Sequence, residues 1–497
     1  MIKKAQAVAF GASLALSLAC AGPGTDETHL AVSERDALFK RLSALESGLP
    51  DLLTRTAVPG LAVAVLLDGE IVWSRGFGSR RANAPDRQEV DESSIFGAAS
   101  LTKPVVSYAV MKLVDEGRLE LDRPLVEYLA YEDLTDDLRS RTITARMVLS
   151  HSTGLPNWRP DRWTDNPGRL ATQFEPGSRF QYSGEGMIYL QRVVEEITGQ
   201  PLDELLMEAV FEPLGMTNSS LLWEERFEEN YAVPHGEDLT PREDRRPDEA
   251  LAAGTLQTTA IDYARFLIAV LDGIGLADGT LEEILTPQVE VREGVWWGLG
   301  WGLEEGEAGK AIWQWGHDPG SRAFAIAVPD RRLGMVFFAN SDNGMLLLRT
   351  IVEGTLGGIE HPALDHLDYE SFDSPRRLVT IEIERSILEE GIPRARARYA
   401  ELRKEHPEEA FEETMLNRLA YKLLGSDNIE EAIALFELNV EAYPEAFNTY
   451  DSLGEAYMIH GDVELAIAHY EISLRLNPEN GNAVEMLKKL REGGAGL

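Results

Sequence analysis

The chain has 497 residues, of which 44% are hydrophobic, so it is long enough for two or three domains with large packed cores. Its formal net charge of −37 argues against a nucleic-acid backbone as a partner. The acidic residues are spread along the chain, which predicts solubility and poor affinity for anionic surfaces.

Residues 1–20 have the pattern of a signal peptide. Lys3 and Lys4 precede an apolar run from Ala5 to Ala19 that is too short to span a bilayer. Cys20, the only cysteine, closes that run and resembles the lipidated cysteine of bacterial lipoproteins. We therefore expect an exported protein, periplasmic or on the cell surface, whose one contact with a membrane is a lipid anchor at Cys20. Ser17 stands where such signals usually have Leu or Val, which keeps ordinary secretion open as the alternative.

The next segments predict a tether, a helix and two strands. Residues 21–32 have the composition of a short polar tether, and residues 33–56 carry leucines at helical spacing. Residues 60–67 and 71–77 are apolar and β-branched, and Asp68-Gly69 between them is a strong hairpin signal. The folded domain is thus expected to open helix, strand, strand.

Ser100-Leu101-Thr102-Lys103 is the most informative stretch of the chain. At the start of a predicted helix, Ser-x-x-Lys places a hydroxyl and an amine on one helical face, one turn apart. A partly desolvated lysine can lose its proton near neutral pH and then accept the serine proton, which makes a nucleophile. Between Arg41 and Arg403 the chain has lysine only at positions 103, 112 and 310. This usage favours a lysine that deprotonates, because arginine cannot do so.

The rest of the first domain alternates between helix, loop and strand. Residues 123–255 are predicted to be mostly helix and loop, and Ile261–Leu271 to be a helix. Strands are expected near Trp297–Leu303, Ala323–Pro329 and Gly334–Ala339. Strands at both ends with helices between them predict an α+β fold around an antiparallel sheet.

The C-terminal region is helical, charged and periodic. Pro444 and Pro478 lie one 34-residue repeat apart, the period of the tetratricopeptide repeat. Further pairs recur at that offset: Leu419 and Leu453, Ala432 and Ala466, and Phe436 and Tyr470. Ala395, Tyr399 and Pro407 predict a degenerate earlier copy, and residues 482–491 a capping helix. We expect a first folded domain at 33–360, a linker at 361–377 and a repeat domain at 378–497.

Three further motifs accompany Ser100 and Lys103. They are Tyr182-Ser183-Gly184 before a helix that starts near Met187, Trp315-Gly316-His317-Asp318-Pro319-Gly320 before a strand, and His151-Ser152-Thr153-Gly154 between the first two motifs. In this order and spacing they resemble the serine β-lactamase-related family, over roughly residues 35–355. That family includes class C β-lactamases, low-molecular-weight penicillin-binding proteins, D-aminopeptidases and esterases. The resemblance implies a β-lactamase/transpeptidase-like antiparallel sheet flanked by helices, with a helical subdomain, ahead of an all-α tetratricopeptide-repeat solenoid.

The resemblance also implies roles for the site residues. Ser100 is the expected nucleophile, Lys103 its base, and Tyr182 the residue that passes protons to the leaving group and activates water. His317 is expected in the position of the family's Lys/His-x-Gly motif, where its charge, with that of Lys103, would lower the pKa of Tyr182. The backbone N–H groups of Ser100 and Gly320 are the expected oxyanion donors. His151 is interpreted as a structural residue that shapes a loop near the site.

Two departures from the family pattern bear on the substrate. Gly184 replaces the Asn of Tyr-x-Asn, which orients the lysine and holds a substrate amide carbonyl. Pro319 replaces a Gly of the third motif and has no N–H to donate. Both changes favour an esterase or peptidase over an efficient β-lactamase.

These observations lead to a cell-envelope serine hydrolase that forms an acyl-enzyme on Ser100. The expected substrates are esters or D-amino-acid peptides and amides, with β-lactams as the alternative. No cofactor is expected, and no metal, because the nine histidines show no ligand spacing. A reading of a different class remains open, in which the hydrolase domain is inactive and the repeats bind a protein partner. A mixed reading, in which an active hydrolase also recruits a partner through the repeats, is open as well.

Overall fold

The computed structural model describes residues 26–84, 88–134, 136–164, 167–242, 246–306, 309–358, 360–426 and 428–491, with side chains from residue 34 onward. The expected signal segment, including Cys20, lies outside the described residues. The part of the expected tether that is described, from Asp26, belongs to helix α1 (Asp26–Thr56), so this helix begins seven residues before the predicted start. In the part of the chain that the structure describes, no helix has the length and apolar character needed to cross a membrane.

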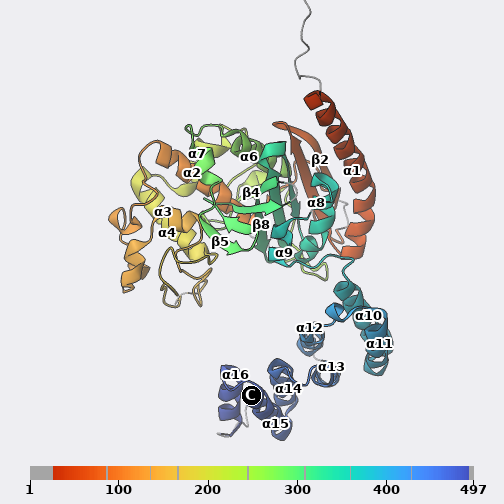
Figure 1. Ribbon diagram of the computed structural model, residues 1–497. Helices are drawn as coiled ribbons and strands as arrows, with labels where there is room; N and C mark the ends of the chain where they lie inside the picture. The colour runs from red at the N-terminus through yellow and green to blue at the C-terminus, as the bar shows by residue number, and fades with distance from the viewer. Residues whose placement is uncertain are drawn as a thin grey trace, which may run out of the picture.

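An antiparallel sheet forms the centre of the hydrolase domain (Figure 1). Its eight strands lie in the order β2-β1-β10-β9-β8-β7-β6-β5. Their bounds are β1 Gly60–Leu67, β2 Glu70–Gly78, β5 Val289–Arg292, β6 Val295–Trp297, β7 Gly302–Gly306, β8 Gly309–Asp318, β9 Ser321–Val328 and β10 Leu333–Ala339. A separate short pair joins β3 (Phe96–Gly97) to β4 (Gln257–Thr258). The predicted hairpin is confirmed: Asp68 and Gly69 connect β1 to β2, both with positive φ.

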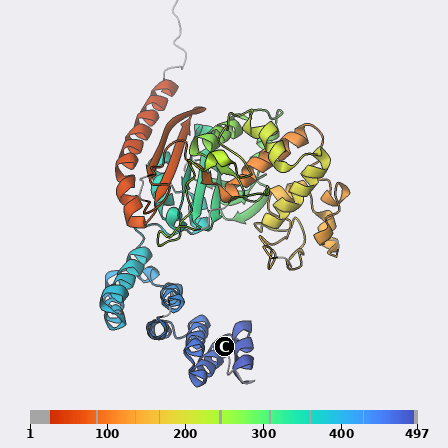
Figure 2. The same ribbon diagram turned by 180° about the vertical axis from the view of Figure 1, so that it is seen from behind.

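Helices cover both faces of this sheet, so alternate residues of one strand enter two different cores. From β1, Leu61, Val63 and Val65 pack with α1 and α8 (Leu348–Leu356), whereas Ala62, Ala64 and Leu66 pack toward α2 (Thr102–Asp115) and α6 (Ala260–Asp272). The remaining helices of the domain are α3 Ala145–Leu149, α4 Gly184–Thr198, α5 Leu202–Leu206, α7 Thr280–Ile284 and α9 Pro362–Leu367. The expected α+β class, with a helical subdomain beside the sheet, is confirmed (Figure 2).

The strand prediction near the end of the domain was partly wrong. The single strand expected over Trp297–Leu303 is two strands, β6 and β7, joined by a turn in which Gly300 has a φ of 90°. Strand β8 was not predicted, although its tryptophans alternate with Gln314 and Gly316 at the two-residue period of a strand. This miss has consequences for the site.

The C-terminal region folds into helical hairpins that fit the predicted repeats. The pairs are α10 Pro375–Glu390 with α11 Ile392–Glu405, α12 Glu413–Gly425 with α13 Ile429–Ala442, and α14 Phe447–His460 with α15 Val463–Leu476, followed by α16 Gly481–Arg491. The residues that recur at the predicted offset are buried in one cluster: Leu419, Ala432, Phe436, Leu453, Ala466 and Tyr470. This cluster contains no residue of the hydrolase domain, so the repeats have a core of their own.

Residues 361–372, expected to be part of a linker, pack onto the hydrolase domain, and we call them the strap. His361 Nδ1 lies 2.5 Å from Oε1 of the buried Glu304, whose other oxygen accepts the backbone N–H of Ala363 at 2.8 Å. Leu364 is buried in the core between the sheet and α1. The strap is therefore part of the hydrolase domain in packing terms.

The strap continues along the sheet toward β8. The His366 ring lies 5.9 Å from the Trp313 ring, and the Tyr369 hydroxyl lies 3.0 Å from Nδ1 of His317. At its end, the guanidinium of Arg55 lies over the Phe372 ring at 4.4 Å.

These contacts predict different outcomes for two truncations. A chain that ends at Ser374 keeps the strap, and we expect its hydrolase domain to unfold at nearly the urea midpoint of the full chain. A chain that ends at Gly358 loses the His361 and Ala363 contacts to Glu304 and the buried Leu364 side chain, and loss of one buried leucine costs about 2–5 kcal/mol of unfolding free energy. Urea unfolding followed by tryptophan fluorescence measures both. Equal midpoints for the two truncated chains would contradict a structural role for the strap.

Candidate active site

Ser100 lies where a short 3₁₀ turn, Ala99–Leu101, runs into α2. Ala99 has a φ of 47°, an unfavourable conformation for a residue other than glycine and typical of functional turns. Thr102 holds this turn in place: its hydroxyl donates to Ala99 O at 2.7 Å and accepts from Leu256 N at 3.0 Å. The Ser100 side chain is left partly exposed at the start of the helix.

Lys103 is buried beside Ser100. Its Nζ donates to Ser100 Oγ at 3.0 Å and to the backbone oxygen of Ala253 at 2.6 Å. Burial lowers the pKa of Lys103 to about 7, although the charge of Asp318 opposes the shift. The amine can therefore be neutral near physiological pH while it stays within hydrogen-bond reach of the serine.

Tyr182 completes the group. Its hydroxyl is hydrogen-bonded to Ser100, and its ring lies 4.9 Å from Lys103 Nζ. Burial raises the pKa of Tyr182 above its usual value, so the phenol stays protonated. The expected lowering of this pKa was wrong, because desolvation outweighs any neighbouring charge. Tyr182 can donate or relay a proton, but it does not start as a tyrosinate.

His151 is structural, as interpreted. It is buried, its Nδ1 accepts the backbone N–H of Ser183 at 3.2 Å, and its ring packs against Tyr182 with the centroids 4.2 Å apart. Burial, helped by the charge of Lys103, lowers its pKa well below the usual value. A neutral His151 thus sets the position of Tyr182.

Strand β8 presents an open edge near the serine. It pairs with β7 only as far as Trp313, so from Gln314 to Asp318 it pairs with β9 alone. Gln314 is fully buried, and its Nε2 donates to Tyr182 OH at 2.9 Å and approaches Ser100 O at 3.4 Å. A side chain at Gly316 would lie 2.5 Å from Ala98 O, so this position needs glycine.

Geometry therefore assigns the third motif to Gln314-Trp315-Gly316, not to His317-Asp318-Pro319. The His317 side chain, one residue past Gly316, faces the other side of the strand, where its Nδ1 contacts Tyr369. The structure does not bring the His317 imidazole to Tyr182 or Lys103 among the described contacts. Its expected catalytic role is corrected accordingly.

The expected oxyanion role of Gly320 is also wrong. Pro319 and Gly320 form the two-residue turn between β8 and β9, and the Gly320 N–H donates to Asp342 Oδ1 at 2.8 Å. A donor already bound to a carboxylate cannot hold a developing negative charge. In a two-residue hairpin closed by the pair Asp318–Ser321, the backbone N–H of His317 points away from β9, to the open edge.

One sequence signal could have found Gln314. Pro-Gly is a turn signal, and reading Pro319-Gly320 as a hairpin turn places the preceding residues on a strand. Counting back along that strand puts Gln314 and Gly316 on one face and the His317 side chain on the other.

Gly184 leaves room for an aromatic ring. A Cβ at this position would lie 2.6–2.9 Å from three atoms of the Trp158 indole. The Gly184 N–H donates to Asn157 Oδ1 at 3.0 Å. Residues 157 and 158 thus fill the space where the family has its Asn side chain, and Lys103 finds its second partner in Ala253 O instead.

We expect Gly184→Asn to lower the thermal midpoint by displacing Trp158, at a cost of about 1–3 kcal/mol for the overpacked site. Thermal unfolding followed by circular dichroism measures this. In a protein that already carries Trp158→Ala, Gly184→Asn should lower the thermal midpoint by less than it does in the wild type. Purely additive effects would contradict the steric explanation.

A cleft of about 270 Å³ opens beside Ala99. Its lining includes Trp163, Tyr231, Arg246, Thr255 and Asp318. Trp163 is exposed and lines this cleft, whereas Trp297 is fully buried against His151 and Tyr182. Across the described residues, no three His, Cys, Asp or Glu side chains are grouped as a metal site would require.

Comparison with known proteins shows the family of the chain. The model of the beta-lactamase family matches residues 36–350. Penicillin-binding protein 4 of Amycolatopsis lactamdurans is 29% identical over 358 residues, which cover 63% of this chain and 89% of that protein. Esterase EstB of Burkholderia gladioli is 32% identical over 217 residues, which cover 38% of this chain and 54% of that protein.

A solved structure of a class C beta-lactamase superposes with a TM-score of 0.56 at 19% sequence identity. The match covers 65% of this chain and 97% of that chain. At this identity the likeness supports the fold alone.

Proposed function

Since the chain belongs to the beta-lactamase family of serine hydrolases, we propose that it hydrolyses esters through an acyl-enzyme on Ser100. The observation that carries the proposal is the desolvated Lys103 amine, 3.0 Å from Ser100 Oγ. Few structural needs explain a buried lysine with a pKa of about 7, whereas a general base needs that value.

In the acylation step, Lys103 Nζ takes the proton of Ser100 Oγ as Oγ attacks the substrate carbonyl carbon. The carbonyl oxygen gains a negative charge, which the N–H groups of Ser100 and His317 stabilise. Tyr182 gives its proton to the leaving oxygen and recovers one from Lys103. The products of this step are an ester of Ser100 and a free alcohol.

Deacylation reverses these roles with water as the nucleophile. As water attacks the acyl carbon, its proton passes to Tyr182 while Tyr182 passes its own proton to Lys103, and Ser100 Oγ leaves with the proton that Lys103 returns. The acid is released and the starting protonation state is restored.

The neutral third motif supports esters over β-lactams. Gln314 offers an amide beside Tyr182, and an amide cannot neutralise an anionic substrate as a lysine there would. Gly184 with Trp158 replaces the amide side chain that would hold a substrate amide carbonyl. A D-amino-acid peptide remains a substrate of the same chemistry, and the esterase among the relatives supports the ester.

Labelling of purified residues 21–497 tests the proposal. A fluorophosphonate should label the protein, and Ser100→Ala should abolish the label without changing the circular dichroism spectrum. A fluorescent penicillin, used in parallel, should label weakly or not at all. Labelling by both probes would restore β-lactams as substrates, and labelling by neither would favour a binding role for the repeats.

The location in the cell envelope is part of the same proposal. It rests on the sequence of residues 1–20, in which Cys20 follows an apolar run. Expression with radiolabelled palmitate in a bacterial host should label the protein and should not label Cys20→Ser. Incorporation into both proteins would exclude Cys20 as the lipidated residue.

A further inference from the structure

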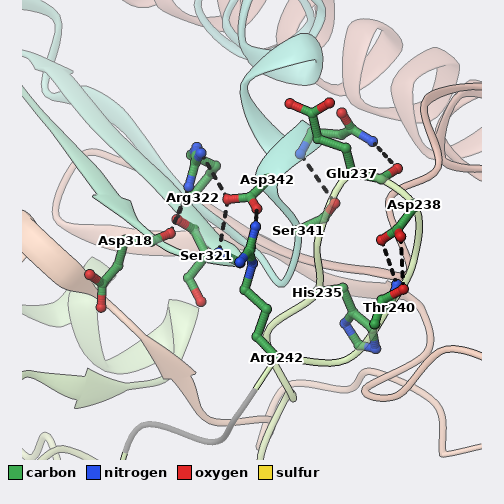
Figure 3. Close-up of polar contacts among 12 residues, drawn as sticks. His235, Glu237, Asp238, Thr240, Arg242, Asp318, Ser321, Arg322, Ser341 and Asp342 are labelled. Carbon is green, nitrogen blue, oxygen red and sulfur yellow. Dashed lines mark hydrogen bonds and ion pairs between the residues drawn. The ribbon is translucent and has the colours of Figure 1, made fainter. Parts of the chain in front are cut away.

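We propose that Asp342 is a positioning residue that fixes the β8–β9 hairpin and, through it, the backbone N–H of His317 at the oxyanion site. The inference rests on the proposed function. Figure 3 shows Asp342 between Arg322, on β9, and Arg242, on a loop that faces the hairpin. None of these three side chains belongs to the serine, lysine and tyrosine group.

Asp342 uses both carboxylate oxygens. Oδ1 accepts the Gly320 N–H at 2.8 Å and Arg322 Nη2 at 2.9 Å, and Oδ2 accepts Arg242 Nε at 3.0 Å. The Asp342 side chain is 10% exposed and that of Arg322 is 8% exposed. Burial by itself would raise the pKa of Asp342, but the Gly320 N–H and the two arginines lower it, so the group is charged at neutral pH.

The hairpin tip is held from a second side as well. Gly320 O accepts the backbone N–H of His235 at 3.2 Å, and a Cβ on Gly320 would lie 2.6 Å from Pro234 Cβ. Arg322 Nη1 also donates to the backbone oxygen of Asp318 at 2.6 Å. The tip thus has polar contacts on both flanks, and Asp342 is the anion that the arginine contacts depend on.

The distance along the strand is short. His317 is only two residues before the turn, so its N–H moves with the hairpin tip. Without the Asp342 carboxylate, the Gly320 N–H loses its acceptor and the guanidinium groups of Arg322 and Arg242 lose the carboxylate that they share. Misplacing a catalytic donor by about 1 Å can lower a rate by about 10²-fold.

The test compares Asp342→Ala and Asp342→Asn with wild type in the hydrolysis of p-nitrophenyl butyrate. We expect Asp342→Ala to lower kcat by about 10- to 100-fold, with KM within twofold of wild type. Asp342→Asn keeps an acceptor for the Gly320 N–H, so its kcat should lie between those of Asp342→Ala and wild type. It also has the same shape as aspartate, so it replaces Asp342→Ala if the alanine variant does not fold.

The matched control is Asp272→Ala. Asp272 pairs with Arg332 at 2.7 Å next to β10, away from the Pro319-Gly320 turn. A kcat for Asp342→Ala or Asp342→Asn equal to that of Asp272→Ala, or a change confined to KM, would overturn the proposal.

A readout independent of turnover separates this inference from the proposed function. The pKa of His317 is lowered by burial and by Arg322 and raised by Asp342. NMR titration of the His317 ring, which also contacts Tyr369 OH, should show a lower pKa in Asp342→Asn. A wild-type protein without turnover would contradict the proposed function, and an unmoved His317 pKa would contradict control of this edge by Asp342.

Discussion

Replacing Lys103 by methionine is expected to lower kcat/KM for an ester by about 10²- to 10⁴-fold, the contribution of a well-placed general base. Methionine keeps the hydrocarbon that fills the buried site and removes the amine that receives the Ser100 proton. Because the Lys103 side chain is only 2% exposed, water cannot occupy the position of the missing amine and accept the Ser100 proton in its place. Hydrolysis of p-nitrophenyl butyrate measures the change.

Lys112 provides the matched control. It lies on the same helix as Lys103. Its Nζ donates to the backbone oxygen of Ala209 at 2.8 Å and not to Ser100. Lys112→Met should retain kcat/KM within about threefold of wild type. If Lys103→Met and Lys112→Met lost activity equally, the loss would reflect stability and Lys103 would not be the base.

The pH dependence of the reaction follows from the same residue. Lys103 has a pKa of about 7, and only its neutral form can accept a proton. The value of kcat/KM should therefore fall about tenfold per pH unit below 7 and level off above it. A rate that is independent of pH between 5 and 8 would exclude Lys103 as the titrating base.

The same shift affects stability with a definite sign. An ordinary lysine has a pKa near 10.5, so between pH 7 and 10.5 the unfolded chain binds a proton that the folded chain has released. The contribution of Lys103 to the unfolding free energy therefore increases with pH across this window. In Lys103→Met this part of the slope should be absent.

Glu185→Ala is expected to cost about 3–5 kcal/mol of unfolding free energy, because it leaves a buried arginine without its main counter-charge. Glu185 has a fully buried side chain in the first turn of α4, where a negative charge is also favoured by the helix dipole. Both Glu185 oxygens accept from Arg159, at 2.9 and 2.7 Å, and the Arg159 side chain is 3% exposed. Urea unfolding measures the loss.

The control for this prediction lies on the same helix. Glu196 is exposed, and Glu196→Ala should change the unfolding free energy by less than about 0.5 kcal/mol. Glu185→Gln retains the shape and one acceptor oxygen and should cost less than Glu185→Ala. A loss in Glu185→Ala no larger than in Glu196→Ala would show that the Arg159 pair contributes little.

The sequence predicted those parts of the fold that depend on local patterns. The Asp68-Gly69 hairpin, the buried repeat positions such as Ala432 and Ala466, and the serine–lysine pair one helical turn apart all follow from spacing along one element. The strands at both ends of the first domain predicted the antiparallel sheet, the family resemblance implied the same sheet, and the fold confirms it.

The errors arose where a tertiary contact decides the outcome. No local pattern shows that the Gly320 N–H is bound by Asp342, or that the pairing of β7 with β8 ends at Trp313 and leaves an edge of β8 open. The pKa of Tyr182 depends on how deeply it is buried, which its motif does not encode. The assignment of His317 failed because Pro319-Gly320 was not recognised as the turn that ends a strand, so the register of the residues before it was not counted.

The strap ties the position of the repeats to that of the active site. Its Tyr369 contacts His317, and only residues 370–374 separate this tyrosine from helix α10, the first helix of the repeats. If the repeats bind a ligand, this short connection holds that ligand on the same chain as Ser100, and linked groups reach local concentrations in the millimolar range for short linkers. For a substrate attached to such a ligand, capture would become an intramolecular event. Its hydrolysis would then be insensitive to dilution, whereas hydrolysis of a free ester would fall in proportion to its concentration.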